Sequence, residues 1–303
     1  MTQLNYYELE PEDNHFTDVV IDVTHRCNMM CKNCYIPNRE IPDMDADLMI
    51  ETIKKFPKRV AIRIIGAEPT MRQDLPELIT RILDTGHRVT LLTNGLRLAR
   101  ENYVKGLKDA GLKHLYLSLN GVDNDDWYEK IDEMRCSKKK IQAMINANKY
   151  NLLRDVGCII VNGVNEEAPA RMIDMFKRHD IKNVVVRFKT IGQLGRYMEG
   201  VHQMGMDSLI NIVCKQLNLK EDYVRWWQNN WIYPDSRQEK DSFLFPLDPK
   251  QRLVYKGIWI KLVNWNTDGK TTVLENSTRR GRVTENFKVA PFFEHVTNNE
   301  GGY

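Results

Sequence analysis

The sequence predicts an α/β protein in which a partial (βα)6 TIM-like barrel is followed by a C-terminal α+β extension. Over the first two thirds of the 303 residues, short apolar segments alternate with amphipathic, helix-like segments. Strands that are apolar throughout and separated by helices are typical of a parallel sheet covered by helices. Six such units favour an incomplete barrel over a complete eight-fold one, and the crossovers are expected to be right-handed.

Each expected strand is short and is followed by a turn or a helix. The six strands are expected at 17–24, 59–66, 88–95, 113–121, 155–165 and 183–192. The helices between them are expected at 45–56, 75–85, 100–110, 137–150 and 168–179. In the first helix Leu48, Ile50 and Ile53 recur at helix-like spacing, which supports the assignment.

The alternation ends near residue 200, where the composition changes. Three parts are expected: an N-terminal extension over 1–16, the partial barrel over 17–200, and a substrate-covering extension over 201–303. The extension is expected to contain a helix near 206–217 and two strands between 252 and 274, with their turn at "NTDG" (266–269).

The composition indicates which broad class of protein the chain belongs to. A charged fraction of 28% and a hydrophobic fraction of 42% are ordinary for a soluble globular chain. Apolar runs such as "VAIRIIGA" are too short to cross a bilayer, and the polar, acidic first residues do not resemble a secretory signal, so no membrane contact and a cytoplasmic location are expected. In that reducing compartment the six cysteines are not expected to form a disulfide framework. A net charge of +3 permits a nucleic-acid partner without indicating one.

The densest chemical motif is "HRCNMMCKNCY", which places Cys27, Cys31 and Cys34 within eight residues. The other cysteines are scattered: Cys136, Cys158 and Cys214. Zinc sites usually take four ligands, commonly in two separated pairs. A [4Fe–4S] cluster is normally held by four thiolates, so three would leave one iron open to a small molecule. The compact group favours the cluster; zinc with His25 or a distant fourth ligand, and ordinary buried thiols, remain alternatives.

Four motifs together resemble the radical S-adenosylmethionine (radical SAM) superfamily. Cx3Cx2C follows the first expected strand, and "GAEPT" (66–70) follows the second, where the family carries Gly-Gly-Glu-Pro. "LLTNG" (91–95) and "LSLNG" (117–121) end the third and fourth strands in forms typical of the family. The resemblance covers roughly residues 17–190. Within the superfamily, the motifs most resemble those of the branch that contains the molybdenum-cofactor cyclase and the peptide-modifying enzymes.

The resemblance implies the cofactors and the residues that hold them. It implies a [4Fe–4S] cluster on Cys27, Cys31 and Cys34, S-adenosylmethionine (SAM) on the fourth iron, and a flavodoxin- or ferredoxin-type electron donor. Glu68 is expected to accept a hydrogen bond from the SAM amino group, with a helix-start carboxylate before Pro69 as the alternative. The other expected SAM-binding residues are Gly66, Ala67, Thr93, Asn94, Ser118 and Asn120. For the Asn-Gly pair an ordinary turn is the alternative.

The sequence also departs from the family pattern. Ala67 stands where a second glycine is usual, and Asn33 stands where an aromatic residue is usual. Both changes are mild, because alanine is small and adenine contact at position 33 is expected through backbone. Only Cys214 follows residue 200, so the full set of cysteines for an auxiliary cluster, which many peptide-modifying members carry, is absent.

The substrate residues are the least specified. Arg187, on the sixth strand, is expected to face the barrel interior and to need an anionic partner, either a ligand carboxylate or a neighbouring acid. Arg279, Arg280 and Arg282 in "RRGR", together with the tryptophans of the extension, suit phosphate contact and base stacking, with a solvated loop as the alternative. Cys158 is a candidate hydrogen-atom donor, with a buried structural thiol as the alternative.

The function favoured by the sequence is a radical SAM enzyme acting on a nucleotide or a modified nucleic-acid base. The first alternative is radical modification, rearrangement or epimerisation of a peptide or small metabolite. The second is a non-catalytic metal-binding module.

Overall fold

The structure is a computed structural model that describes residues 7–32, 34, 36, 38–190, 204–229, 253–263 and 280–292. No helix within these ranges is long and apolar enough to span a membrane.

The strands form one open, curved sheet. They are β1 (Asp18–Asp22), β2 (Ala61–Ile65), β3 (Arg88–Thr93), β4 (His114–Ser118), β5 (Leu153–Ile160), β6 (Val185–Thr190), β7 (Leu253–Tyr255), β8 (Ile258–Val263), β9 (Arg280–Val283) and β10 (Val289–Pro291). Their order is β10-β9-β1-β2-β3-β4-β5-β6-β8-β7. Strands β1 to β6 are parallel, β8 and β9 extend the parallel set at its two ends, and β7 and β10 are antiparallel edges. The partial barrel predicted from the sequence is confirmed, with the sheet unclosed.

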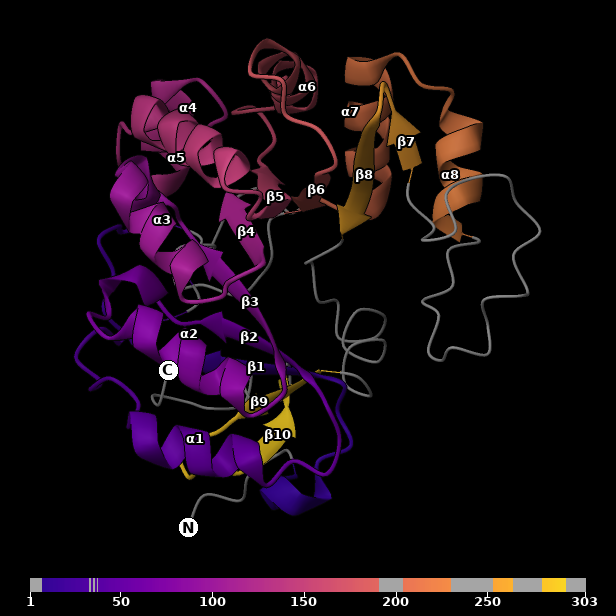
Figure 1. Cartoon of the computed structure of the whole chain (residues 1–303). Coiled ribbons are helices and arrows are strands. Elements are labelled where there is room, and N and C mark those ends of the chain that lie inside the picture. The colour runs from indigo at the N-terminus through magenta and orange to yellow at the C-terminus, as the bar shows by residue number, and fades with distance from the viewer. Residues whose placement is uncertain are drawn as a thin grey trace.

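Helices follow the outside of this arc (Figure 1). They are α1 (Ala46–Lys54), α2 (Leu75–Asp84), α3 (Glu101–Asp109), α4 (Asp125–Asp132), α5 (Ser137–Lys149), α6 (Ala168–Arg178), α7 (Met206–Leu217) and α8 (Glu221–Asn229). Three 3-10 turns complete the described elements: η1 (Pro11–Asp13), η2 (Pro69–Met71) and η3 (Leu96–Ala99). Helix starts follow local chemistry. Asp45 accepts from Leu48 N at the start of α1, and Asn124 accepts from Asp126 N at the start of α4.

Alternate residues of the strands divide between the two faces of the sheet. On β6, Val186 and Phe188 are buried in the core beneath the helices, whereas Arg187 and Lys189 are partly exposed on the inner face of the arc. Strand β8 repeats this pattern, with Lys261 on the inner face. The apolar core therefore lies between sheet and helices, and the concave side of the sheet carries charged side chains such as Arg187, Lys189 and Lys261.

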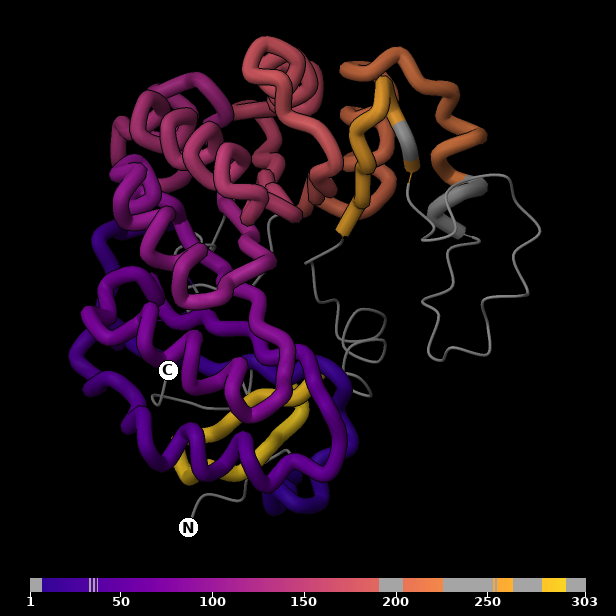
Figure 2. Tube along the Cα trace, viewed as in Figure 1, coloured from indigo at the N-terminus to yellow at the C-terminus, as the bar shows by residue number. Residues whose placement is uncertain are grey.

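The extension predicted after residue 200 joins the barrel sheet rather than standing beside it. Strands β8 and β9, which both come from it, pair with β6 and β1 at opposite ends of the arc (Figure 2). The expected boundary itself lies in 191–203, outside the described residues.

Two details of this extension differ from the sequence prediction. The hairpin turn lies at Lys256 and Gly257, between β7 and β8, where both residues have positive φ (48° and 80°), as a two-residue primed turn requires. "NTDG" lies outside the described residues. Residues Arg280 to Val283 form β9, so the solvated-loop alternative for "RRGR" is wrong for Arg280 and Arg282.

A glycine on β5 makes room for an aromatic ring of β4. A Cβ atom built on Gly157 would lie 1.8 Å from the Tyr116 hydroxyl, so the ring of Tyr116 packs directly over this position. The inner face therefore carries a tyrosine held flat against the neighbouring strand.

Gly157→Ala is expected to lower the free energy of unfolding by about 1–3 kcal/mol, because the added methyl group overpacks the Tyr116 ring. The control is Gly106→Ala in α3, where an added Cβ meets nothing within 4 Å. It is expected to be neutral or stabilising by about 0.5–1 kcal/mol, because alanine favours a helix interior. Urea denaturation measures both. Equal effects of the two variants would contradict the packing account.

Candidate functional site

Four motifs predicted to act together follow four neighbouring parallel strands. The cysteine loop follows β1, "GAEPT" follows β2, the Thr93–Asn94 pair ends β3, and Ser118 ends β4. Carboxyl ends of parallel strands meet at one rim of a sheet, where functional loops gather. The structure therefore brings these motifs to the same rim.

The cysteine loop is anchored on both sides of its thiols. Met29 is buried against Tyr128 and Cys136, and Lys32 N donates to Ile131 O at 3.0 Å, so the loop packs on the end of α4. Cys34 N donates to Cys31 O at 3.2 Å, which turns the chain between the second and third thiols. The three cysteines thus lie on a loop and not on a helix.

N–H groups point at two of the sulfurs. Cys27 Sγ accepts from Met29 N at 3.4 Å and from Asn94 Nδ2 at 3.9 Å, and Cys34 Sγ accepts from Arg39 Nη2 at 2.9 Å. Donors of this kind are the groups that surround iron-bound thiolates.

Burial raises the pKa values of the Cys27 and Cys31 thiols, so both hold their protons without a metal. Among the described residues, no three His, Cys, Asp or Glu side chains form a ready-made metal-binding group. Three thiols on one loop, two of them accepting from N–H donors, nonetheless fit a cluster bound through three thiolates better than a closed four-ligand zinc site.

The segment after β2 lies directly against the start of the cysteine loop. Ala67 N donates to Thr24 O at 2.9 Å, and Glu68 N donates to Arg26 O at 3.0 Å. Gly66 has φ 145°, and a Cβ atom there would lie 2.3 Å from Thr24 O, so this position requires glycine. Ala67 is partly exposed, and its methyl group is compatible with the same backbone path.

Glu68 joins the ends of β2 and β3. Its side chain is fully buried, and Oε1 accepts from Thr70 N (3.0 Å), Thr70 Oγ1 (2.6 Å) and Thr93 Oγ1 (2.6 Å). Oε2 accepts from Asn94 N at 2.7 Å. Because Glu68 also caps η2, the helix-start alternative is what the structure shows. Direct contact between Glu68 and SAM stays a prediction.

Asn94 connects β3 to the cysteine loop. Its Nδ2 donates to Asn28 Oδ1 at 2.8 Å as well as approaching Cys27 Sγ, and its Oδ1 accepts from Leu96 N at 3.0 Å. Gly95 adopts φ 84°, so the Asn-Gly pair is also a turn. The ordinary turn is therefore confirmed, and contact between Asn94 and SAM stays a prediction.

Ser118 and Asn120 differ in how accessible their side chains are to a ligand. Ser118 is partly exposed at the rim. Asn120 is buried, and its amide donates to Asp132 Oδ1 at 2.9 Å and accepts from Ile159 N at 3.1 Å. Asn120 thus ties β4 to β5 and α4, and its predicted contact with SAM has less support than that of Ser118.

Sequence reasoning missed Lys140. This side chain of α5 is buried, and its Nζ donates to Asn94 O at 2.6 Å and to Ser118 O at 3.2 Å. In sequence, the basic run "SKKK" suggests a helix face exposed to solvent. Helical spacing could have identified Lys140, because it lies on the same helix face as Ala143, Met144 and Ala147, which are all buried.

The predicted substrate residues are not gathered at this rim. Arg187 pairs with Asp155 at 2.6 Å, which is the neighbouring-acid alternative. Cys158 is fully buried in the core and donates to Asn120 O at 3.7 Å, which supports a structural thiol. Arg280 lies 3.6 Å from Asp18.

Arg282 is fully buried, with its guanidinium 2.5 Å from Asp22. Arg282 thus pairs with an acid of the neighbouring strand β1, and its predicted contact with phosphate stays a prediction. Arg279 lies outside the described residues.

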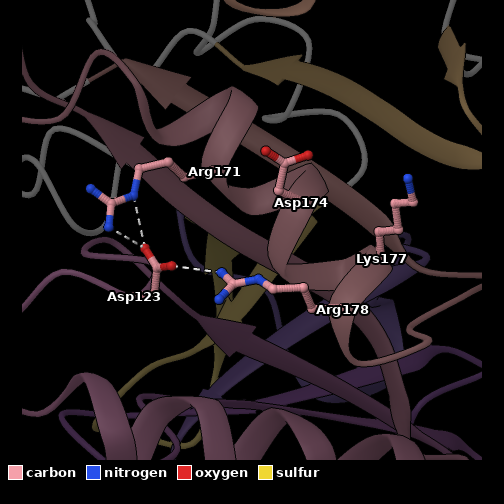
Figure 3. A pocket seen from close by; sticks show the side chains of 5 residues that line it. All are labelled: Asp123, Arg171, Asp174, Lys177 and Arg178. Atoms are coloured by element: carbon pink, nitrogen blue, oxygen red, sulfur yellow. Dashed lines mark hydrogen bonds and ion pairs between the residues drawn. The ribbon is translucent and has the colours of Figure 1, made fainter.

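A surface hollow of about 620 Å³ lies on the outer side of the barrel, over α6 (Figure 3). It is lined by Asp123, Arg171, Asp174, Lys177 and Arg178. Asp123 pairs with Arg171 at 2.8 Å and with Arg178 at 2.7 Å, so its charge is already shared between two arginines of α6. We interpret these pairs as fixing α6 to the loop after β4, away from the cysteine loop.

A family profile described as the radical SAM superfamily matches residues 21–176, just over half of the chain. The 7,8-dihydro-6-hydroxymethylpterin dimethyltransferase of Methanocaldococcus jannaschii is 43% identical over 114 residues, which are 34% of this chain and 22% of that protein. The GTP 3',8-cyclase of Staphylococcus aureus is 29% identical over 189 residues, which are 58% of this chain and 55% of that protein. The chain thus matches from about a fifth to about half the length of these curated relatives.

Solved structures share the fold. SuiB of Streptococcus suis, bound to the precursor peptide SuiA, aligns with a TM-score of 0.64 at 14% identity, over 94% of this chain and 61% of that one. The protein anSMEcpe, with bound AdoMet and the Kp18Cys peptide, aligns with a TM-score of 0.51 at 16% identity, over 69% of this chain and 61% of that one. At these identities the likeness supports the partial barrel and no finer statement.

Glu68→Ala is expected to lower the free energy of unfolding by about 3–5 kcal/mol, because it leaves the donors of Thr70, Thr93 and Asn94 buried without an acceptor at roughly 1–3 kcal/mol each. The control is Glu77→Ala, an exposed glutamate of α2, for which a change within about 0.5 kcal/mol is expected. Chemical denaturation of the metal-free proteins measures both. A Glu68→Ala protein as stable as the control would show that this carboxylate is not the junction of β2 and β3.

Proposed function

The chain belongs to the radical SAM superfamily, and from this we propose that it acts on a nucleotide, abstracting a hydrogen atom from it. Enzymes of this superfamily use a [4Fe–4S] cluster and SAM. The observation that carries the proposal is the three-thiol loop packed against the ends of β2 and β3, with Asn94 contacting both Cys27 and Asn28.

Different residues of the chain would hold the cluster and SAM. Cys27, Cys31 and Cys34 would hold three irons and leave the fourth for the amino and carboxylate groups of SAM. When bound, the cluster and SAM supply a one-electron reductive cleavage that yields a 5′-deoxyadenosyl radical, and the protein supplies orientation and exclusion of water. The backbone of Gly66 and Ala67, together with Thr93 and the Ser118 side chain, lines the rim where SAM would lie.

The positioning groups lie one step behind that rim. Glu68 fixes the backbone of Asn94, and Lys140 binds the carbonyl oxygens of Asn94 and Ser118. All three contacts are partly buried, and they tie together the ends of β2, β3 and β4. We assign Glu68 and Lys140 as positioning residues rather than catalytic ones.

Two observations support a nucleotide over other substrates. The names of the two curated relatives point to a pterin and to GTP, both fused nitrogen heterocycles. Trp259 lies on β8, two residues before Lys261 and on the same inner face. An aromatic ring beside a cation suits a base with its phosphate.

A peptide substrate is the second candidate. It is favoured by the fold shared with SuiB and anSMEcpe, each described with a bound peptide. Against it stands the cysteine count, since only Cys214 follows residue 200. A flavodoxin- or ferredoxin-type electron donor and a cytoplasmic location complete the proposal.

Anaerobic reconstitution tests the cofactor assignment. The wild-type chain is expected to bind about four irons, and alanine at Cys27, Cys31 or Cys34 is expected to abolish this iron content and SAM cleavage. The matched controls are Cys136→Ala, Cys158→Ala and Cys214→Ala, which should retain iron. Colourless wild-type protein that binds zinc would support the non-catalytic metal-binding alternative instead.

Substrate-dependent formation of 5′-deoxyadenosine tests the substrate class. The reduced protein with SAM is incubated with pools of nucleotides and, separately, with pools of peptides. A nucleotide-dependent increase is expected. An increase confined to the peptide pool would overturn the nucleotide assignment and leave the superfamily chemistry intact.

A further inference from the structure

Arg39 brings a positive charge to the third thiol of the cysteine loop. Its Nη2 donates to Cys34 Sγ at 2.9 Å, whereas the N–H donors of Met29 and Asn94 lie 3.4 Å and 3.9 Å from Cys27 Sγ. A neutral thiol is a weak acceptor, and hydrogen bonds become shorter and stronger when the partners are charged. The contact therefore suits a guanidinium paired with a thiolate, which is the form of cysteine that binds metal.

Arg39 differs in its partners from the other arginines near the loop. Arg26 Nε donates to Asp43 at 3.1 Å, and Arg72 pairs with Asp74 at 2.7 Å. Over the residues that the structure describes, Arg39 forms no ion pair with a carboxylate, and its Nη1 is buried without a hydrogen-bond partner. A buried guanidinium nitrogen normally has an acceptor, and a buried cation normally has an anion. The position of Arg39 thus indicates more negative charge at this loop than one thiol supplies.

Two contacts fix the backbone that carries this side chain. Asn38 O lies 3.0 Å from the Nδ1 of His25, at the start of the cysteine loop, and Asn38 Oδ1 accepts from Glu40 N at 2.9 Å. Arg39 therefore lies on a turn that is bound to the beginning of the loop, while its guanidinium contacts Cys34 near the end of the loop. A donor that is already in place needs little reorganisation when its acceptor gains charge.

A positive charge at this sulfur has a consequence for electron transfer. A [4Fe–4S] core bound by three thiolates is an anion, and an added electron makes it more negative. The reduction potential of such a cluster depends on its net charge and on the hydrogen bonds to its sulfurs. A cation that contacts one of the thiolates stabilises the reduced form more than the oxidised form, because Coulomb attraction grows with charge.

We propose that Arg39 is the charge partner of the iron–sulfur cluster, holding Cys34 as a thiolate ligand and raising the reduction potential of the cluster. The inference rests on the proposed function in taking Cys27, Cys31 and Cys34 as the iron ligands. One electron passes from the donor protein to the cluster, and no bond or proton changes at Arg39. Because it acts through Cys34, Arg39 is a positioning residue.

A potentiometric titration of the anaerobically reconstituted protein tests this assignment in the absence of SAM and substrate. It is followed by the electron paramagnetic resonance signal of the reduced cluster. Arg39→Gln is expected to lower the equilibrium constant for reduction by about tenfold or more, because a charge-assisted hydrogen bond is lost. Tenfold corresponds to about 59 mV for a one-electron couple. Arg39→Lys is expected to lie between Arg39→Gln and the wild type, because lysine keeps the charge but not the planar fork.

The matched control is Lys32→Met. Lys32 lies in the same loop and the variant removes the same unit of charge, but its side chain is exposed. Water and salt screen an exposed charge, so a change of less than about threefold is expected. A shift in Lys32→Met as large as that in Arg39→Gln would show that the net charge of the loop sets the potential, and it would overturn the assignment of Arg39.

Iron analysis decides the case in which a variant loses the cluster. Iron loss in Arg39→Gln with a full cluster in Arg39→Lys supports the assignment, because only the variant without the charge fails. Iron loss in both variants overturns it, since the arginine is then needed for its shape and not for its charge.

The outcomes also separate this inference from the proposed function. Equal potentials in the wild type and Arg39→Gln overturn the inference, and nucleotide-dependent 5′-deoxyadenosine in the same wild-type protein leaves the proposed function standing. A shifted potential in Arg39→Gln without any nucleotide-dependent 5′-deoxyadenosine in the wild type overturns the proposed function and leaves the role of Arg39 standing. A wild-type protein that binds no iron overturns both.

Discussion

The buried carboxylate of Glu68 is the contact on which the arrangement of the rim depends. It accepts four hydrogen bonds from the ends of β2 and β3, while its own backbone N–H is donated to Arg26 at the start of the cysteine loop. A buried carboxylate is costly unless its oxygens are satisfied, so the surrounding donors are held in one geometry. Glu68 therefore connects the ends of β1, β2 and β3. The start of the cysteine loop includes Arg26, one of the residues that Glu68 contacts.

The structure separates two kinds of polar residue. Those at the rim, such as Asn94 and Ser118, lie where parallel strands end. Those on the inner face, such as Tyr116 and Arg187, lie two or three residues before the ends of their strands, and Arg187 is paired with Asp155. The two sets meet on β4, where Tyr116 on the inner face lies two residues before Ser118 at the rim.

The sequence was enough to predict β1 to β6 and the motifs at their ends, because each βα unit is local and each strand is apolar along its length. It was not enough for β9, since no local pattern shows that Arg280 to Arg282 pair with Asp18 to Val20 across more than half of the chain. Lys140 was hidden in a basic run for a similar reason, because its burial depends on the ends of β3 and β4. The sequence placed Glu68 and Asn120 at strand ends, but it could not show whether they bind a ligand or hold the fold together. That depends on whether neighbouring groups of the protein already form hydrogen bonds with their side chains.

The pairing of β9 with β1 gives the chain a particular order of assembly. During synthesis β1 emerges early, yet its outer edge has no partner until residues 280–283 have been made. Unpaired strand edges invite pairing with other chains, so a partly synthesised chain is more exposed to aggregation than the finished one. The Asp22–Arg282 pair becomes buried only with this last docking step, which makes its closure a late, long-range event of the kind that slows folding.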